Sequence, residues 1–204
     1  RQRSFSLLAT LALIPLAITL LQTTSDGTHL VYALGNWVAP YGIVLVVDRL
    51  AAWMLLTTSL LAVFALLYAV RMPSPQPSPQ MGEGANAKPK TAYDTEGRHF
   101  HVLFQLQLFG LNGAFLTGDL FNLFVFFEIL LIASYGLLLH GGGAQRARSG
   151  MHYVVLNLLG STLFLFAAGL FYGVLGTLNF ADIAVRIAST PPENLGLVRA
   201  AGLM

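Results

Sequence analysis

The stretch FNLFVFFEILLIASY (residues 121–135) sets a single carboxylic acid, Glu128, near the middle of an otherwise apolar run. Its sequence neighbours Phe127 and Ile129 cannot hydrogen-bond an acid. In lipid, every backbone N–H and C=O group needs a partner within its own segment, so a run this apolar predicts a membrane-spanning helix. Such a helix has no need of an acid, and Glu128 is therefore the first candidate for a functional residue.

The composition of the whole chain agrees with a membrane protein. Of its 204 residues, 55% are hydrophobic and 10% are charged, whereas soluble domains carry about 25% charged residues. The net charge of +2 is too small to indicate a nucleic-acid partner. The chain has no cysteine, which excludes disulfides, thiol nucleophiles and thiolate metal sites. The sequence shows no metal-ligand pattern, phosphate loop or Ser–His–Asp arrangement, so we expect no cofactor, no metal and no enzymatic activity.

Five apolar stretches are long enough to cross a hydrocarbon core of about 30 Å, which takes roughly 20 helical residues. The predicted fold class is an all-α polytopic membrane protein. The chain begins with Arg1 and stops at Met204 inside a new apolar run, so we expect one partial transmembrane domain cut at both ends. The predicted spans cover residues 4–22, 50–70, 100–117, 120–139 and 151–175, and a sixth begins near residue 195.

The connections between the predicted spans differ in character. Residues 23–49 contain two β-prone runs around a turn-rich centre, which predicts a β-hairpin at the membrane surface. Residues 72–98 are rich in Pro, Ser, Gln and Gly and predict a disordered loop. Residues 177–190 predict a short amphipathic surface helix with Asn179 as its N-cap and an i,i+4 pair between Asp182 and Arg186.

The distribution of basic residues predicts the orientation. With five alternating spans, eight of the eleven basic residues lie on the side that holds the chain start, the 72–98 loop and the 140–150 loop. The positive-inside rule places that side in the cytoplasm, so the hairpin and the amphipathic helix face outward. The eight residues are Arg1, Arg3, Arg71, Lys88, Lys90, Arg98, Arg146 and Arg148.

The depth of Glu128 makes its charge expensive. Asp119 marks the outer end of the predicted span, and Glu128 lies nine residues further along, or roughly 13 Å, close to the bilayer midplane. An ionised carboxylate there costs at least about 3 kcal/mol. Burial favours the neutral acid and a nearby cation favours the ionised form. A carboxyl group that moves between these states is a proton-relay site; the alternative is a structural acid hydrogen-bonded between helices.

Few polar groups are placed to support Glu128. On its own helical face only Tyr135, two turns away, has a polar tip, and Phe127 is its neighbour in sequence. Other partners must come from another span or from water. Near the outer end of the span, Thr117, Asp119 and Asn122 are interpreted as helix-start and capping groups. Candidate neighbours on other spans are Gln105, Gln107, Asn112, Asn157, Ser161 and Thr162.

Four histidines fall at the predicted cytoplasmic ends of the spans. Because imidazole titrates near neutral pH, these side chains are candidates for proton uptake toward Glu128. The alternative interpretation is that they are simply solvated at the membrane interface. The four are His99, His101, His140 and His152.

Three stretches of the chain resemble a known family. GAFLTGDLFNLFVFFEILLIASYGLLLH (113–140) is similar to the most characteristic segment of the D subunit of the Mrp-type multisubunit monovalent cation/proton antiporters. YALGNWVAPYGIVLVVDRLAAWMLL (32–56) and LGTLNFADIAVRIA (175–188) look like the hairpin with its following span and the surface helix of that protein. The antiporter-like subunits of respiratory complex I are related but share less of this wording.

The resemblance implies a subunit of about fourteen spans with two inverted repeats, each containing a broken helix. This chain then covers the second to sixth spans. Glu128 falls on the family's essential glutamate, and its lysine partner is expected beyond Met204. The implied partners are the lipid bilayer of a bacterial plasma membrane, other small membrane subunits, protons, and Na⁺ or K⁺. The Pro/Ser/Gln-rich insert within 72–98 departs from the family pattern.

Three functions remain open from the sequence. The first is a proton-translocating subunit of a cation/proton antiporter with Glu128 as the relay. The second is a proton-pumping module of a redox complex, such as a respiratory NADH dehydrogenase or a membrane hydrogenase, in which the chemistry around Glu128 is the same. The third is a structural membrane subunit that does not transport, for which Glu128 should tolerate replacement by leucine.

Overall fold

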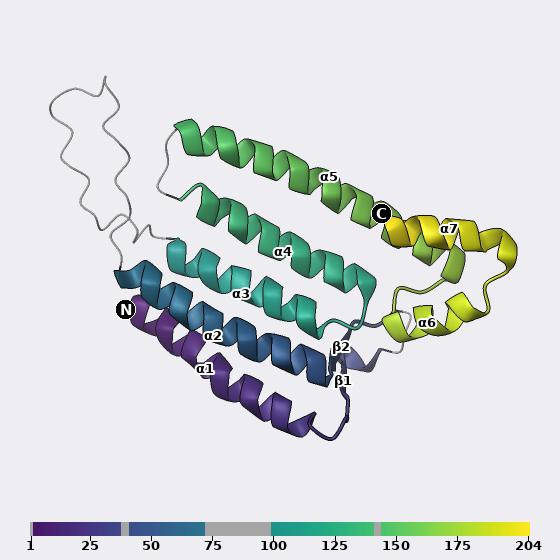
Figure 1. Ribbon diagram of the computed structural model, residues 1–204, viewed down its shortest axis with the longest axis horizontal. Helices are drawn as coiled ribbons and strands as arrows, with labels where there is room; N and C mark the ends of the chain where they lie inside the picture. The colour runs from purple at the N-terminus through teal and green to yellow at the C-terminus, as the bar shows by residue number, and fades with distance from the viewer. Residues whose placement is uncertain (1, 38–40, 72–98, 141–143) are drawn as a thin grey trace.

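The computed structural model describes residues 2–37, 41–71, 99–140 and 144–204. The disordered loop predicted for 72–98 lies outside these residues. Within the described ranges, five long helices lie side by side (Figure 1). They are α1 (Gln2–Thr23), α2 (Arg49–Arg71), α3 (Phe100–Leu116), α4 (Leu120–Leu138) and α5 (Ala144–Leu175).

Most of these helices are long and apolar enough to cross a membrane. Among the described residues, α1, α2, α4 and α5 meet both conditions. Helix α3 has 17 residues, or about 26 Å, because the backbone becomes extended at Thr117 (φ −73°, ψ 138°). The prediction of a helical membrane protein is confirmed, and the chain is an integral membrane protein. The number of five complete spans remains a prediction.

Helix α5 begins earlier than predicted. The apolar run starts at Met151, but the helix starts at Ala144. Residues 144–150 (AQRARSG) include alanine and arginine, which favour helix without being apolar. Hydropathy finds the part of a helix that enters lipid, and it does not find a polar extension into water.

Helices α1 and α3 are joined by a buried polar cluster. The Gln105 side-chain nitrogen donates to the Ser6 carbonyl oxygen at 3.2 Å and to the Ser6 and Thr10 hydroxyl oxygens at 2.9 Å each. Ser6 and Thr10 are fully buried. Inter-helix hydrogen bonds of this kind stabilise membrane bundles by about 0.6 kcal/mol on average. Gln105 therefore fastens α3 to α1 and points away from α4.

Helices α3 and α4 approach closely at glycine. A Cβ atom on Gly110 would lie 2.8 Å from the Leu130 backbone nitrogen and 2.9 Å from the Phe126 carbonyl oxygen. One turn along, a Cβ on Gly113 would overlap the Phe126 ring. Small residues that let backbones touch are the usual means of helix association in lipid. This contact fixes which face of α4 is turned toward α3.

The predicted hairpin is present at one end of the long helices (Figure 1). Strand β1 (Leu30–Ala33) pairs antiparallel with β2 (Val44–Val47), with Leu30 opposite Val47 and Ala33 opposite Val44. A short 3₁₀ helix, η1 (Leu34–Asn36), follows β1. Gly35 and Asn36 both have positive φ (63° and 57°), a conformation that glycine and asparagine adopt most easily.

Two short helices follow α5. Helix α6 (Phe180–Ala188) is capped by Asn179 as predicted. The predicted Asp182–Arg186 pair is wrong: Arg186 donates to the Leu175 carbonyl oxygen at 2.7 Å, and Asp182 accepts from the Thr177 hydroxyl. The guanidinium is drawn to the carbonyl end of α5, where the helix dipole is negative.

Helix α7 (Pro192–Leu203) packs against α5. It begins three residues before the expected start at 195. Proline at the first helical position has a φ angle already suited to a helix, and its missing N–H costs nothing there. The start of α7 is thus set by Pro192 and not by the apolar run that follows it.

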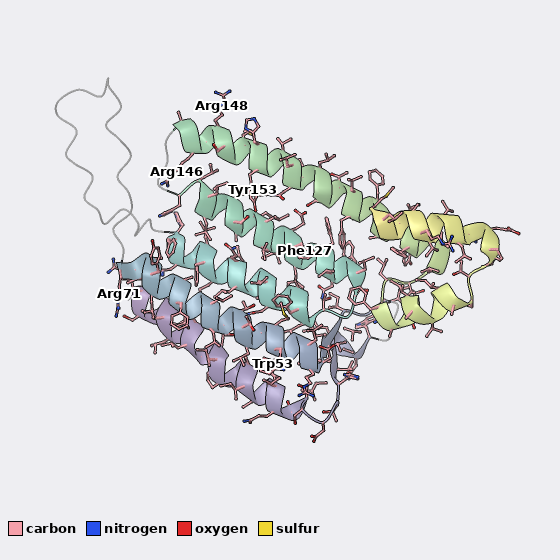
Figure 2. The ribbon with its side chains drawn as sticks, viewed as in Figure 1. Trp53, Arg71, Phe127, Arg146, Arg148 and Tyr153 are labelled. Atoms are coloured by element: carbon pink, nitrogen blue, oxygen red, sulfur yellow. The ribbon has the colours of Figure 1, made fainter. Side chains whose placement is uncertain are left out.

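Basic side chains lie at the same end of several helices. Arg71, at the end of α2, and Arg146 and Arg148, near the start of α5, lie at the end where the chain begins (Figure 2). Trp53 lies toward the opposite end, near the hairpin (Figure 2). The charge asymmetry used for the orientation is therefore present in the fold. Which side faces the cytoplasm remains a prediction.

Candidate functional site

Helix α4 is fixed at its start by a buried carboxylate. Asp119 accepts a hydrogen bond from the Asn122 backbone nitrogen at 2.9 Å, so it is the N-cap that the sequence predicts. Both Asp119 and Asn122 are buried. Because α4 then continues without interruption to Leu138, the cap determines how far along the helix axis Glu128 lies.

Glu128 is half-buried, and one of its oxygens is enclosed. Its Oε1 atom is shielded from solvent and has no hydrogen-bond partner among the described residues. On the neighbouring positions of the helix surface, Phe121 and Ile132 are 50% and 57% exposed. The acid therefore sits at the edge between the buried side of α4 and its open apolar side. An enclosed polar atom without a partner is rare in proteins and calls for an explanation.

A cavity of about 340 Å³ lies between α4 and α5. It brings together three of the residues expected to support Glu128, namely Phe127, Asn157 and Ser161. The Asn157 amide nitrogen is enclosed and has no hydrogen-bond partner among the described side chains and backbone. Phe127 of α4, labelled in Figure 2, packs edge-on against Phe164 of α5 with ring centroids 6.3 Å apart. The remaining lining is mostly apolar.

Tyr135 is a polar neighbour of the acid on α4, and neither Tyr135 nor Glu128 lines the cavity itself. Tyr135 interacts electrostatically with Glu128 and with the Asn157 side chain. Its ring packs edge-on against Tyr153 of α5, with centroids 5.7 Å apart. Tyr153 is not among the residues that the sequence singles out. Two tyrosines on facing helices are the signal that would have found it, once α4 and α5 are known to be neighbours.

Other candidate neighbours of Glu128 turn elsewhere. Gln105 bonds to α1. Asn112 lines a different cavity, of about 370 Å³, together with residues of α1 and α2 such as Ala17 and Ser59. The Thr162 hydroxyl donates to the Leu158 carbonyl oxygen of its own helix at 2.7 Å. The tight α3–α4 contact explains the first two, because it turns the polar side of α3 toward α1 and α2.

The four candidate histidines separate into two pairs. His101 is buried, and its Nδ1 atom has no partner in the described part of the chain; the same is true of the His140 Nε2 atom. The Phe100 ring lies between them, with centroids 5.4 Å from His101 and 5.8 Å from His140. His99 and His152 are exposed, and the His152 ring contacts the Arg148 carbonyl oxygen at 2.8 Å.

No metal centre is built from the residues that the structure describes, since no three His, Asp or Glu side chains gather within reach of one ion. Tyr135 instead supplies a phenol that interacts with Glu128, and Asn157 and Ser161 supply a carboxamide and a hydroxyl to the cavity between α4 and α5. These groups can hydrogen-bond water and both forms of a carboxyl group.

Comparison with known proteins identifies the family. The family described as NADH:quinone oxidoreductase/Mrp antiporter, TM, matches residues 117–203, which include Glu128. The D subunit of a probable K(+)/H(+) antiporter of Rhizobium meliloti (strain 1021) is 48% identical over 195 residues, covering 93% of this chain and 32% of that protein. This chain belongs to the NADH:quinone oxidoreductase/Mrp antiporter family.

Two solved structures, one of a respiratory complex and one of an Mrp complex, share the fold of this chain. The Mrp complex from Dietzia sp. DQ12-45-1b matches with a TM-score of 0.72 and 30% identity, covering 98% of this chain and 36% of that one. An archaeal membrane-bound sulfane sulfur reductase matches with a TM-score of 0.75 and 28% identity, covering 98% and 38%. The chain therefore spans about a third of the length of its relatives, and the family resemblance inferred from the sequence is confirmed.

Proposed function

We propose that this chain forms part of a proton-translocating membrane subunit of a multisubunit monovalent cation/proton antiporter, with Glu128 as the proton-relay site. The observation that carries the proposal is the enclosed Glu128 oxygen, which has no partner among the described residues. A carboxylate in that position is costly when ionised. Its neutral and ionised forms therefore respond strongly to whatever water or cation reaches it.

The cavity between α4 and α5 lies beside the helix that carries Glu128, although Glu128 does not line it. Its volume of about 340 Å³ exceeds that of several waters, each of which occupies about 30 Å³ in the liquid. Asn157 and Ser161 can hydrogen-bond to such waters, and Tyr135 interacts electrostatically with Glu128. We infer that hydration of this cavity lets Glu128 release its proton, and that drying of the cavity favours proton uptake.

We propose that protons enter at the helix ends that carry Arg71, Arg146 and Arg148. His101 and His140 each present an enclosed ring nitrogen without a partner in the described residues, and both flank Phe100. An imidazole ring can accept a proton on one nitrogen and release one from the other. His99 and His152 are exposed and are expected to act only as solvated interfacial groups.

The wider assembly is part of the same proposal. We place α3 across the membrane as a fifth span, because it lies between α2 and α4 (Figure 1). The arginine-rich end is assigned to the cytoplasm of a bacterial cell by the positive-inside rule. The exchanged ion is a monovalent cation, Na⁺ or K⁺, and the partners are small membrane subunits of the antiporter and the surrounding lipid.

A second function has its own support. The sulfane sulfur reductase that matches this chain is described as a respiratory membrane complex, so a redox-driven proton pump would use the same helices. The chemistry at Glu128 does not separate the two functions. The subunits and cofactors that copurify with the whole protein do separate them.

The test is to purify the whole subunit with its native partners and reconstitute the complex into vesicles. An antiporter is expected to exchange Na⁺ or K⁺ for protons when only a pH gradient is applied, and to purify without flavin or iron–sulfur absorption. Transport that requires an electron donor, with flavin and iron–sulfur subunits in the preparation, would instead establish the redox pump.

A further inference from the structure

Two helices of this chain start with the same sequence pattern. TGDLFN (117–122) precedes and opens α4, and TLNFAD (177–182) precedes and opens α6. In both, a threonine is followed two residues later by Asp or Asn, and three residues after that by Asn or Asp. The acidic and amide positions are exchanged between the two copies. We call residues 117–122 and 177–182 the paired caps.

In the first copy the hydrogen bonds close on the threonine. The Asp119 carboxylate caps α4 through the Asn122 backbone nitrogen at 2.9 Å. The Thr117 hydroxyl oxygen accepts from the Asp119 backbone nitrogen at 3.3 Å and from the Asn122 side-chain nitrogen at 3.0 Å. All three residues are at least nine-tenths buried.

The second copy repeats this arrangement with the chemistry reversed. The Asn179 carboxamide oxygen caps α6 through the backbone nitrogens of Ala181 and Asp182, at 3.1 and 3.3 Å. The Thr177 hydroxyl oxygen accepts from the Asn179 backbone nitrogen at 3.3 Å. The same hydroxyl donates to the Asp182 carboxylate at 3.2 Å. Thr177 and Asn179 are also buried.

The two copies are bonded to each other. Asp119 and Asn179 lie opposite one another in an antiparallel bridge. On one side of that bridge the Leu120 backbone nitrogen donates to the Leu178 carbonyl oxygen at 2.9 Å. On the other side the Phe180 backbone nitrogen donates to the Gly118 carbonyl oxygen at 3.0 Å. The paired caps are thus related by a local two-fold axis that runs between residues 119 and 179.

This geometry does more than end-cap two helices. The start of α4 cannot move along its axis without breaking the bridge to the start of α6. Strand β2 holds the same segment, because the Gly118 backbone nitrogen donates to the Val44 carbonyl oxygen at 2.8 Å. Since α4 is continuous from Leu120 to Leu138, the position of its first turn sets the depth of Glu128.

We propose that Asp119 and Asn179 are paired positioning residues: each side chain caps its own helix and so holds the backbone of residues 118–120 or 178–180 in the shape in which the two segments bond to each other. The joined segments set the depth of Glu128 in the membrane. The proposal rests on the proposed role of Glu128 as the proton relay. Neither residue carries the transported proton. Asn179 is the informative member, because it caps only α6 and yet should influence α4.

The test compares capping with non-capping replacements in the whole reconstituted complex. Asparagine and aspartate cap equally well and alanine does not, so Asp119→Asn and Asn179→Asp should retain antiport within about twofold. Asp119→Ala and Asn179→Ala should each lose at least about tenfold in rate per assembled complex, because a displacement of about 1 Å at a reacting group costs up to about 100-fold. Both alanine variants should also shift the pH at half-maximal antiport.

Asp48→Ala is the matched control. Asp48 caps α2 through the Ala51 backbone nitrogen at 2.6 Å and is not part of the paired caps. Its loss should lower stability and leave the pH profile unchanged. If Asp119→Ala fails to assemble, the variants Thr117→Val and Thr117→Ser can be compared instead. Both change the first of the paired caps, and only serine keeps the hydroxyl.

A second readout does not depend on transport. The chain has no native cysteine, so spin labels at Phe121→Cys and Ala181→Cys, both exposed positions, report the distance between the starts of α4 and α6. Asn179→Ala should broaden that distance distribution, and Asn179→Asp should leave it narrow. If the distances behave so while Glu128 proves dispensable, only the proposed function fails.

Two results would overturn the proposal. In the first, Asn179→Ala keeps both the narrow distance distribution and the wild-type pH profile, which would make the two caps independent. In the second, Asp119→Asn is as defective as Asp119→Ala, which would mean that the carboxylate charge itself is required and that Asp119 is not a positioning residue.

Discussion

Replacing Glu128 by glutamine in the whole subunit is expected to abolish pH-driven cation exchange while the complex still assembles. Glutamine has nearly the same size and shape as glutamate but cannot take up or release a proton. Removing a group that transfers protons typically costs about 10²- to 10⁴-fold in rate. The expected rate per assembled complex is therefore below about 1% of the unmodified rate, measured as Na⁺ or K⁺ movement in vesicles under a pH gradient.

The control for lost charge is Glu193→Gln, which removes an exposed carboxylate from the first turn of α7. Its exchange rate should be unchanged. Glu128→Asp keeps the acid on a shorter stem and should retain partial activity. Glu128→Leu addresses the structural alternative directly, since a non-transporting subunit would accept it. Wild-type exchange by Glu128→Gln would contradict the relay, and wild-type exchange by Glu128→Leu would favour a structural role.

Replacing Gly110 by alanine is expected to have the largest effect on stability. The new Cβ would lie 2.8 Å from the Leu130 backbone nitrogen and 3.0 Å from the Leu130 Cα atom. Backbone atoms cannot rotate away as the end of a side chain can, so α3 and α4 must separate. We expect a loss of about 3 kcal/mol, the upper part of the usual range for overpacking, measured by thermal unfolding of the complex in lipid nanodiscs.

The matched control for this change is Gly173→Ala on α5, where a Cβ would meet nothing within 4 Å. Alanine is favoured over glycine inside a helix by about 1 kcal/mol, so this variant should be equally or more stable. If Gly110→Ala were as stable as Gly173→Ala, the close approach of α3 and α4 would be wrong. The assignment of Gln105 and Asn112 to the far side of α3 would fail with it.

The sequence predicts where the helices lie along the chain better than it predicts which faces they turn toward one another. Hydropathy locates α4 and its lone acid because both are local properties of one segment. It does not show that Gln105 faces α1, because the polar residues of α3 do not reveal which neighbouring helix they face. That orientation is decided by Gly110 and Gly113, whose role depends on which helix lies opposite them.

The sequence likewise predicts the caps Asp119 and Asn179 one at a time, and it does not predict that they lie together. Asp119 and Asn179 are each recognisable as caps, because Asp and Asn at the start of an apolar run have a local physical reason. Their pairing joins segments 60 residues apart (179 minus 119), and no local pattern encodes it. The repeated Thr-x-Asp/Asn spacing was available in the sequence, but it predicts two similar caps and not their contact.

Helix α5 contains one feature that hydropathy does not predict, its early start, and one that it does, the polar residue Asn157 within an apolar span. Residues 144–150 form helix by propensity, which a hydropathy window does not measure. Asn157 and Ser161, in contrast, were selected as polar residues within an apolar span, and the structure places both in the cavity beside α4. Because polar residues inside the spans are few, a list of all of them contains Asn157 and Ser161, which line the cavity, and also Gln105 and Thr162, which bond elsewhere.

Proton exchange at Glu128 is tested most directly by infrared difference spectroscopy of the whole reconstituted complex, recorded as the pH is raised. We expect a carboxylic-acid C=O band at low pH that disappears reversibly at higher pH, is absent from Glu128→Gln and remains in Glu193→Gln. A Glu128 band that never changes across the pH range of antiport, or one that is missing at every pH, would contradict the account, because the acid would then carry the same charge throughout.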